Sequence, residues 1–266
     1  MPKTYKISDL FFTSWKQLPT GYHAQLIDLR YKLNTAKLQE MWGAYGHLAI
    51  QILRILRKNK NLVAKITLEQ AVDCLNDLKF IHEPWYHFPP GEDSRFIAPD
   101  EYMHDRTFNQ FVYADAEFTK FCVLDYQGKE SRKPDEMQLN RAINKLIGIL
   151  YTAPERFDER KILSRAGTVD QKMTPAEKAV VLHTYANVRE YIVKERCPNL
   201  FPSSSGDGPA KPVYTGKMWL NLRYDLSETP SFQGLDAAKN AWLYDALDLL
   251  EKKALEISNL PKQATV

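Results

Sequence analysis

The chain has 266 residues, which is longer than most single domains, so the sequence predicts one large domain with an appendage or two smaller domains. Hydrophobic residues make up 44% and charged residues 26%, which argues against a chain that is disordered throughout. The 36 basic and 33 acidic residues give a net charge of +3, too small for the charge footprint that nucleic-acid binding usually needs. We therefore expect no nucleic-acid partner.

Three cysteines, Cys74, Cys122 and Cys197, lie far apart and form no CxxC pair. This pattern argues against a disulfide framework and a zinc ribbon, and it favours a reducing cytoplasm. The N-terminus shows no apolar stretch long enough for a secretion signal. The longest apolar tract, residues 48–56, is far shorter than the roughly 20 residues needed to cross a bilayer. We expect a cytoplasmic protein without a membrane segment.

Helical spacing of apolar residues dominates the first part of the chain. It predicts two helices, or one broken helix, between residues 22 and 58. Thr67 and Gln70 form a capping-box pattern, which predicts a helix that stops before the next proline. The segment PWYHFPP, residues 84–90, favours extended backbone before each proline. We expect this segment to be a loop that is pinned across the helices and buries Trp85.

Helix signals continue through the rest of the chain. A second capping box, at residues 107–110, begins a helix with a strongly aromatic face. Pro134 suits the first turn of another helix, and residues 174–175 give the strongest helix start. The segment 202–213 consists mostly of Pro, Gly and Ser and is expected to be a flexible linker, whereas residues 232–257 carry a further amphipathic helix.

Clear β signals are few, and no repeat period is visible. The sequence therefore predicts a mainly α fold, an irregular helical bundle with an aromatic, proline-rich central loop and a C-terminal helical appendage. In this interpretation residues 1–201 form the helical body, residues 202–213 the linker and residues 214–266 the appendage. Whether the terminal helix docks on the body stays open.

Residues 80–126 form an aromatic block that holds twelve of the chain's 31 aromatic residues. Aromatic side chains that could stack on nucleobases or sugars are Trp85, Tyr86, Phe88, Phe96 and Tyr102. Stacking platforms for nucleic acids usually come with basic residues, but this block has nine acidic residues and three Lys or Arg residues. Structural packing is therefore favoured over a ligand platform, and it stays open whether the outer edge of the loop meets a partner.

Four residues of the block belong to types that bind divalent metals: His82, Glu83, His87 and His104. The spacing H-E-x-x-x-H is one residue longer than the arrangement that puts two histidines on one helical face. Pro84 within it also argues against a helix. We expect no metal and no cofactor, and a metal-dependent enzyme or binding module that uses these four residues is the alternative hypothesis.

Candidate nucleophiles and acid–base pairs are few. Cys74 and Cys122 fall on predicted helix faces and are expected in the core, whereas Cys197 at a helix end is expected to be exposed. The carboxylate pairs Asp115 with Glu117 and Asp245 with Asp248 are expected to face solvent. No GxSxG, P-loop, GxGxxG or HExxH motif occurs, so the sequence predicts a non-enzymatic protein.

Three stretches carry a resemblance to a group of known proteins. They are NDLKFIHEPWYHFPP (76–90), TFNQFVYADAEFTKF (107–121) and the region 146–202, with LIGILYTAPERFDERKI and MTPAEKAVVLHTYANVREYIVKERCPNLFP. Together they resemble uncharacterised helical proteins encoded near the tape-measure gene of tailed bacteriophages and prophages. The resemblance implies a tail assembly chaperone that coats the tape-measure helix in the cytoplasm of the bacterial host. A head–tail connector or another virion component is the alternative.

Such a protein would bind protein partners, a tape-measure or tail protein among them, through apolar helix faces. The residues expected to contact a partner are Trp85, Tyr86, Trp219, Trp242, Leu243, Leu247 and Leu250. The partner's identity and a homo-oligomeric state stay open.

Overall fold

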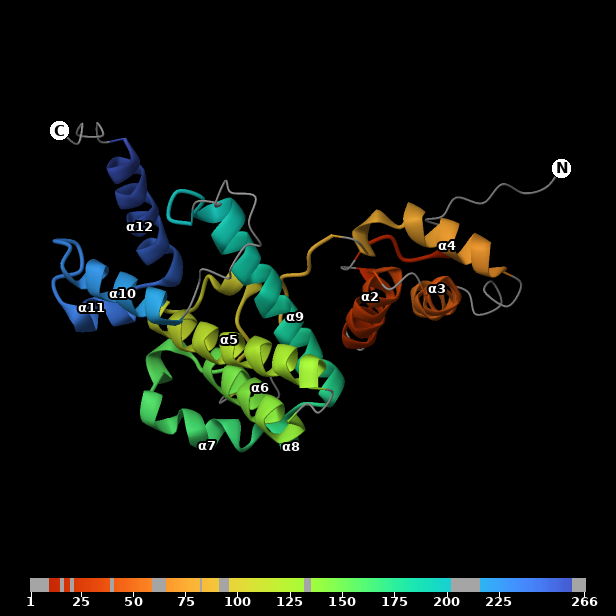
Figure 1. The fold of residues 1–266 in the computed structure, drawn as a ribbon, viewed down its shortest axis with the longest axis horizontal. Coiled ribbons are helices and arrows are strands. Elements are labelled where there is room, and N and C mark those ends of the chain that lie inside the picture. Colours follow the sequence, from red (N-terminus) through yellow and green to blue (C-terminus); the bar gives the residue numbers. More distant parts are fainter. Residues whose placement is uncertain are drawn as a thin grey trace. The chain divides into compact units, whose positions relative to one another are not determined.

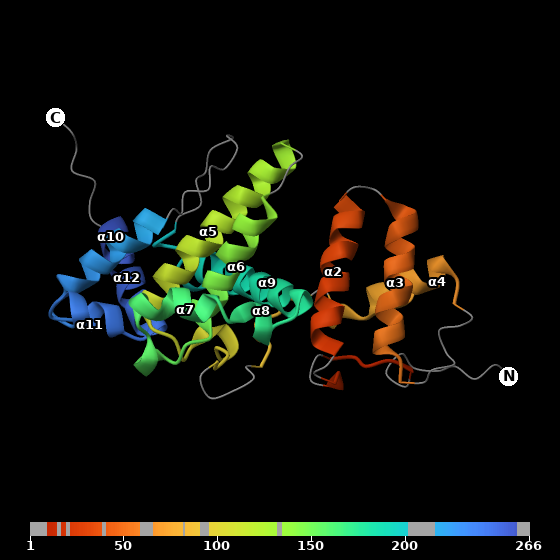
Figure 2. The same ribbon diagram turned by 90° about the horizontal axis from the view of Figure 1, so that it is seen from below.

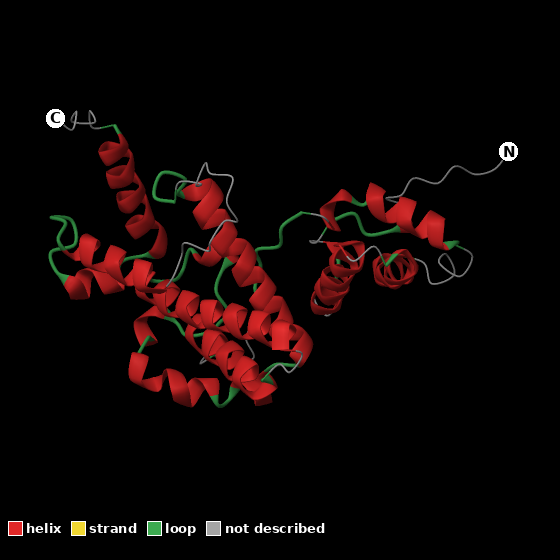
Figure 3. Cartoon of the chain, in the orientation of Figure 1, coloured by secondary structure: helices red, strands yellow, loops and turns green. Residues whose placement is uncertain are grey.

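The computed structural model describes residues 10–14, 17–19, 22–38, 41–58, 66–81, 83–90, 96–131, 135–201 and 216–259. Within these ranges the chain is mainly helical and contains no strand, only two isolated β-bridges, which confirms the expected mainly α fold (Figures 1 and 3). The α-helices are α2 (His23–Leu38), α3 (Trp42–Leu56), α4 (Leu68–Asp77), α5 (Phe108–Ser131), α6 (Glu136–Leu150), α7 (Ile162–Ala166), α8 (Val169–Lys172), α9 (Pro175–Tyr191), α10 (Gly216–Ser227), α11 (Leu235–Asn240) and α12 (Leu243–Ser258).

Short helical turns connect several of these helices. The 3-10 turns are η4 (Lys79–Ile81), η5 (Glu101–Met103), η6 (Pro154–Arg156) and η7 (Glu159–Lys161), and a π-helix, η8 (Ile192–Arg196), follows α9 directly. No helix in the described part of the chain has the length and apolar character needed to span a membrane.

The chain divides into two compact units. Unit 1 comprises Met1–Trp85 and Pro175–Val180, and unit 2 comprises Tyr86–Thr174 and Val181–Val266. This division differs from the expected boundary at 202–213, a segment that lies outside the described residues. The C-terminal helices α10, α11 and α12 all pack on α5, so they are part of unit 2 rather than an appendage of their own.

Unit 1 is built from α2, α3 and α4, with α3 packed between the other two. Its core contains fully buried leucine and isoleucine side chains from all three helices, among them Leu26, Ile52 and Leu75. The helix α4 begins with the predicted capping box, in which Thr67 Oγ1 accepts from the Gln70 amide (3.2 Å) and Gln70 Oε1 accepts from the Thr67 amide (3.1 Å). This cap satisfies backbone donors at the helix start and fixes where α4 begins.

The loop that follows α4 buries Trp85, as expected. The indole packs with Ile27 and Val180 in a small apolar cluster of unit 1, and the His23 ring meets its edge at 5.1 Å. Arg30 Nη1 donates to the carbonyl oxygen of Glu83 at 2.6 Å. These contacts hold the first half of the proline-rich segment against α2.

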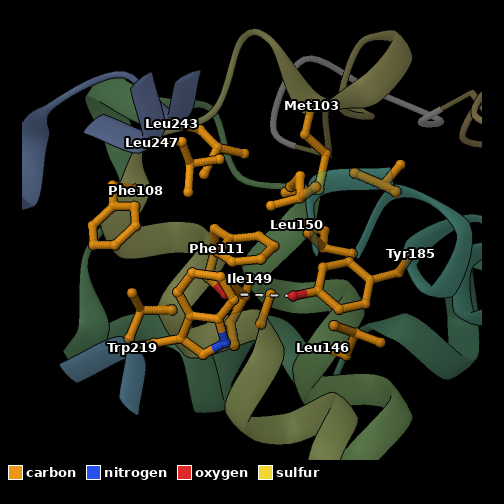
Figure 4. Packing of buried hydrophobic residues seen from close by; sticks show 14 of the residues in the cluster. Met103, Phe108, Phe111, Leu146, Ile149, Leu150, Tyr185, Trp219, Leu243 and Leu247 are labelled. Atoms are coloured by element: carbon orange, nitrogen blue, oxygen red, sulfur yellow. Dashed lines mark hydrogen bonds between the residues drawn. The ribbon is translucent and has the colours of Figure 1, made fainter. Parts of the chain in front are cut away.

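Unit 2 is organised around α5, which lies beside α6 and contacts α10, α11 and α12 (Figure 2). The aromatic face of α5 is in the core, where the Phe111 ring meets the Trp219 ring edge-to-face at 4.7 Å. Figure 4 shows Tyr185 of α9 closing the same cluster, with its hydroxyl directed at the Phe111 carbonyl oxygen (3.5 Å). The predicted aromatic core face of this helix is therefore present.

A buried carboxylate links three helices of unit 2. Asp115 of α5 is fully buried and accepts hydrogen bonds from Arg189 Nε of α9 (2.5 Å) and Trp219 Nε1 of α10 (2.7 Å). The expectation that Asp115 faces solvent was wrong, because it lies one helical turn after Phe111 on the core face. Its neighbour Glu117 is only partly buried and pairs with Lys145 at 3.3 Å.

Candidate binding surface

Most of the residues expected to contact a partner are buried inside unit 2. Trp219, Leu243 and Leu247 are in its core (Figure 4). Leu250 belongs to the same core. The expectation that these four side chains meet a partner is wrong, because the apolar faces of α10 and α12 pack against α5. Trp242 is half exposed, so it remains accessible.

Tyr86, another of the residues expected to contact a partner, packs with two other tyrosines. We call Tyr86, Tyr102 and Tyr191 the tyrosine cluster. The Tyr86 ring stacks on Tyr102 at 4.2 Å between centroids. Tyr191 meets Tyr86 at 5.9 Å and Tyr102 at 4.8 Å. All three side chains are half-buried and pack against the core of unit 2, so part of each residue stays accessible. The cluster joins the proline-rich loop, η5 and the end of α9.

The backbone at the centre of this cluster is strained. Tyr102 and Met103 are consecutive residues with φ of 60° and 66°, in the left-handed region that bulky side chains rarely adopt. Each such residue costs on the order of 1–3 kcal/mol and persists where its surroundings enforce it. The Met103 side chain is fully buried, and the Tyr244 hydroxyl donates to the Tyr102 carbonyl oxygen at 2.8 Å.

A buried arginine fixes the loop that carries Tyr102. Arg106 has no exposed side-chain surface, and it donates from Nε to the carbonyl oxygen of Leu150 and from Nη2 to that of Ile97, both at 2.8 Å. Its Nη1 pairs with the Asp105 carboxylate. The guanidinium thus satisfies the last turn of α6 and both ends of the loop, which holds η5 in place.

The third tyrosine lies at a helix irregularity. Immediately after Tyr191 the chain changes from α9 to the π-helix η8, and the Cys197 amide donates to the Ile192 carbonyl oxygen at 2.9 Å. Short π-helical segments are rare and occur frequently at functional sites. Arg196, at the end of η8, lies over the Tyr244 ring at 5.9 Å and pairs with Asp248 at 2.6 Å. Two unusual backbone segments therefore meet at the tyrosine cluster.

The residues of the metal hypothesis take other roles where the structure describes them. His87 Nε2 pairs with Glu101 Oε1 at 3.3 Å, and the His104 ring lies against Tyr244 at 4.4 Å. Glu83 is exposed, and His82 lies outside the described residues. Among the residues that the structure describes, no three His, Cys, Asp or Glu side chains come together in a group that could hold a metal ion.

The phenols of Tyr86 and Tyr102 are neutral near physiological pH. Burial raises the pKa of Tyr86 to about 12, and Tyr102, Glu195 and Glu190 add to this shift. Burial also raises the pKa of Tyr102, with contributions from Glu101, Tyr191 and Glu195. The cluster thus offers ring faces and neutral hydroxyl groups beside carboxylates, which suits binding by stacking, hydrogen bonding and attraction of cations.

Sequence reasoning weighed Tyr86 and Tyr102 as stacking residues but missed Tyr191. Helical periodicity places Tyr191 near the end of its helix, yet it carries no signal for a contact with residues about ninety positions earlier. The positive φ of Tyr102 and Met103 has no signal in the sequence either, because such positions usually carry Gly or Asn.

The cysteines differ from expectation, and this gives a direct test of burial. Cys197, expected to be exposed, is fully buried, and burial raises its pKa to about 12, whereas Cys122, expected in the core, is exposed.

At pH 8 the Cys197 thiol is protonated and inaccessible. We expect a thiol reagent to modify Cys122 first and Cys197 only after denaturation, as measured by peptide mass spectrometry. Fast modification of Cys197 in the native protein would contradict its burial in the core of unit 2.

Comparisons with known proteins give no match: no protein-family model matches the chain, and neither a curated protein nor a solved structure matches it.

Proposed function

We propose that this chain is a non-enzymatic assembly protein of a bacteriophage tail or a similar particle, and that it binds a protein partner through the tyrosine cluster. The tail context rests on the resemblance of residues 76–90, 107–121 and 146–202. The cluster itself is the observation that supports partner binding. It is a group of half-buried aromatic rings, carried by the strained turn at Tyr102 and the end of the helix at Tyr191.

Tyrosine side chains suit this role because they combine a large apolar ring with a hydroxyl group that can pair with a partner. They are enriched among the residues that contribute most to protein interfaces. Contacts among the three rings, the Tyr244 hydrogen bond and the buried Met103 hold the cluster in one arrangement before binding. A pre-organised surface loses less conformational freedom on association, so more of the contact energy appears as affinity.

The proposal is tested by size-exclusion chromatography with light scattering of the purified chain, alone and with a helical fragment of a phage tape-measure protein. We expect a complex of defined mass that elutes before either component. A chain that elutes unchanged in the presence of the fragment would count against a tape-measure chaperone.

A second measurement separates a chaperone from a virion component. A chaperone leaves when the tail tube is complete, so mass spectrometry of purified particles should not find it. Its presence at a fixed ratio to the tube protein would identify a connector or another structural component instead.

A further inference from the structure

The aromatic block that supplies two rings of the tyrosine cluster differs in charge from the rest of the chain. Residues 80–126 contain nine acidic and three Lys or Arg residues, a net charge of −6, whereas the whole chain has +3. Asp105, Asp115 and Glu117 are paired with Arg106, Arg189 and Lys145, so the remaining acidic residues of the block carry its excess of negative charge. A local potential of this kind selects partners by charge and speeds their approach.

Carboxylates lie at the edges of the cluster itself. Glu101 precedes Tyr102 in η5, Glu190 precedes Tyr191, and Glu195 lies one turn further on in η8, all with exposed side chains. Basic side chains already pair with carboxylates at this edge: Lys194 with Glu190, Arg196 with Asp248, and His87 with Glu101.

Among the carboxylates at the edge, Glu195 affects the pKa of both Tyr86 and Tyr102. It contributes to the raised pKa of Tyr86 and to that of Tyr102, after the effect of burial. It lies four residues after Tyr191, about one helical turn further along the chain in η8. A cation bound at the accessible side of these rings would meet both a ring face and this negative charge.

Aromatic rings attract cations through the negative potential of their faces, and the attraction grows when water is excluded. Such an interaction is present beside the cluster, where the Arg196 guanidinium lies over the Tyr244 ring at 5.9 Å. Phosphate groups are disfavoured here by the carboxylates, and a wholly apolar partner would cover Glu195 without offering it a cation.

We infer that the tyrosine cluster binds arginine or lysine side chains presented by a helical segment of a partner protein. This inference rests on the proposed function and specifies the chemistry of the partner at the same surface. The rings of Tyr86, Tyr102 and Tyr191 supply the contact area, and Glu101 and Glu195 supply the complementary charge.

The test uses two alanine-based helical peptides of equal length, one with four arginines on one face and the other with glutamines at the same positions. Binding of each labelled peptide to the full chain is measured by fluorescence anisotropy at low salt. We expect the arginine peptide to bind at least about tenfold more tightly, and raised salt to reduce this difference. Equal binding of the two peptides, or no binding of the arginine peptide, would overturn the inference.

Variants with neutral side chains show which carboxylates cause the preference for the arginine peptide. The double variant Glu101→Gln and Glu195→Gln keeps the size of the side chains and is expected to lose most of the preference for arginine. Glu155→Gln removes one exposed carboxylate of η6, outside the cluster, and is expected to leave the preference unchanged. If Glu155→Gln loses as much of the preference for the arginine peptide as the double variant does, the preference comes from the negative charge of the whole surface and the inference fails.

These outcomes are distinct from those of the proposed function. If the chain forms a complex with the tape-measure fragment but does not bind the arginine peptide, the proposed function is supported and the cation site is refuted. A chain that binds the arginine peptide but not the fragment keeps the cation site and refutes the tape-measure role.

Discussion

Replacing Asp115 by alanine is expected to lower the free energy of unfolding of unit 2 by about 3–5 kcal/mol. Asp115 is fully buried, and its removal leaves the Arg189 guanidinium and the Trp219 indole N–H without their acceptor in the core. Because a domain is stable by only about 5–15 kcal/mol, this is a large fraction of the total. Urea unfolding followed by circular dichroism measures it, and hydrogen exchange in α5 assigns the loss to unit 2.

The matched control is Asp225→Ala on α10, where the side chain is exposed. It removes the same chemical group and is expected to change stability by less than about 0.5 kcal/mol. If Asp115→Ala behaves like Asp225→Ala, the carboxylate does not link α5, α9 and α10 as described.

Replacing Arg106 by alanine is expected to cost about 3–5 kcal/mol as well, and also to disorder the loop that carries Tyr102. The substitution leaves the carbonyl groups of Leu150 and Ile97 without their donors and removes the partner of Asp105. A lysine at this position cannot replace the planar fork of donors, so Arg106→Lys is expected to be nearly as destabilising. Thermal unfolding and hydrogen exchange of residues 97–106 measure both effects.

Arg160→Ala on η7 is the control for this experiment, because its side chain is exposed. It should leave both the midpoint of unfolding and the exchange of the loop unchanged. Wild-type exchange of residues 97–106 in the Arg106→Ala variant would show that the strained turn is held by other contacts.

The parts of the fold that the sequence predicted correctly are those with local causes. The capping box at Thr107 recurs in the structure, with Gln110 Oε1 3.1 Å from the Thr107 amide nitrogen and Thr107 Oγ1 3.3 Å from that of Gln110. The aromatic core face of α5 and the burial of Trp85 also follow from residue types and their spacing. Each of these signals lies within a few residues of the feature that it predicts.

The errors arise where a residue's role depends on distant segments. Periodicity shows that α12 has an apolar face, but not that α5 of the same chain covers it. For the same reason Leu247 was expected at a partner interface and Asp115 was expected to face solvent. Tyr191 joined the candidate site through a contact across about ninety residues, which one sequence alone does not reveal.

The central claim, that the tyrosine cluster is the partner-binding surface, is tested by measuring complex formation with the tape-measure fragment for Tyr86→Ser, Tyr191→Ser and Tyr224→Ser. Tyr224 is an exposed tyrosine of α10 outside the cluster and serves as the matched control. With native circular dichroism retained, we expect the two cluster variants to weaken binding by about thirtyfold or more and Tyr224→Ser to bind like the wild type. Equal binding by all three variants would contradict the claim.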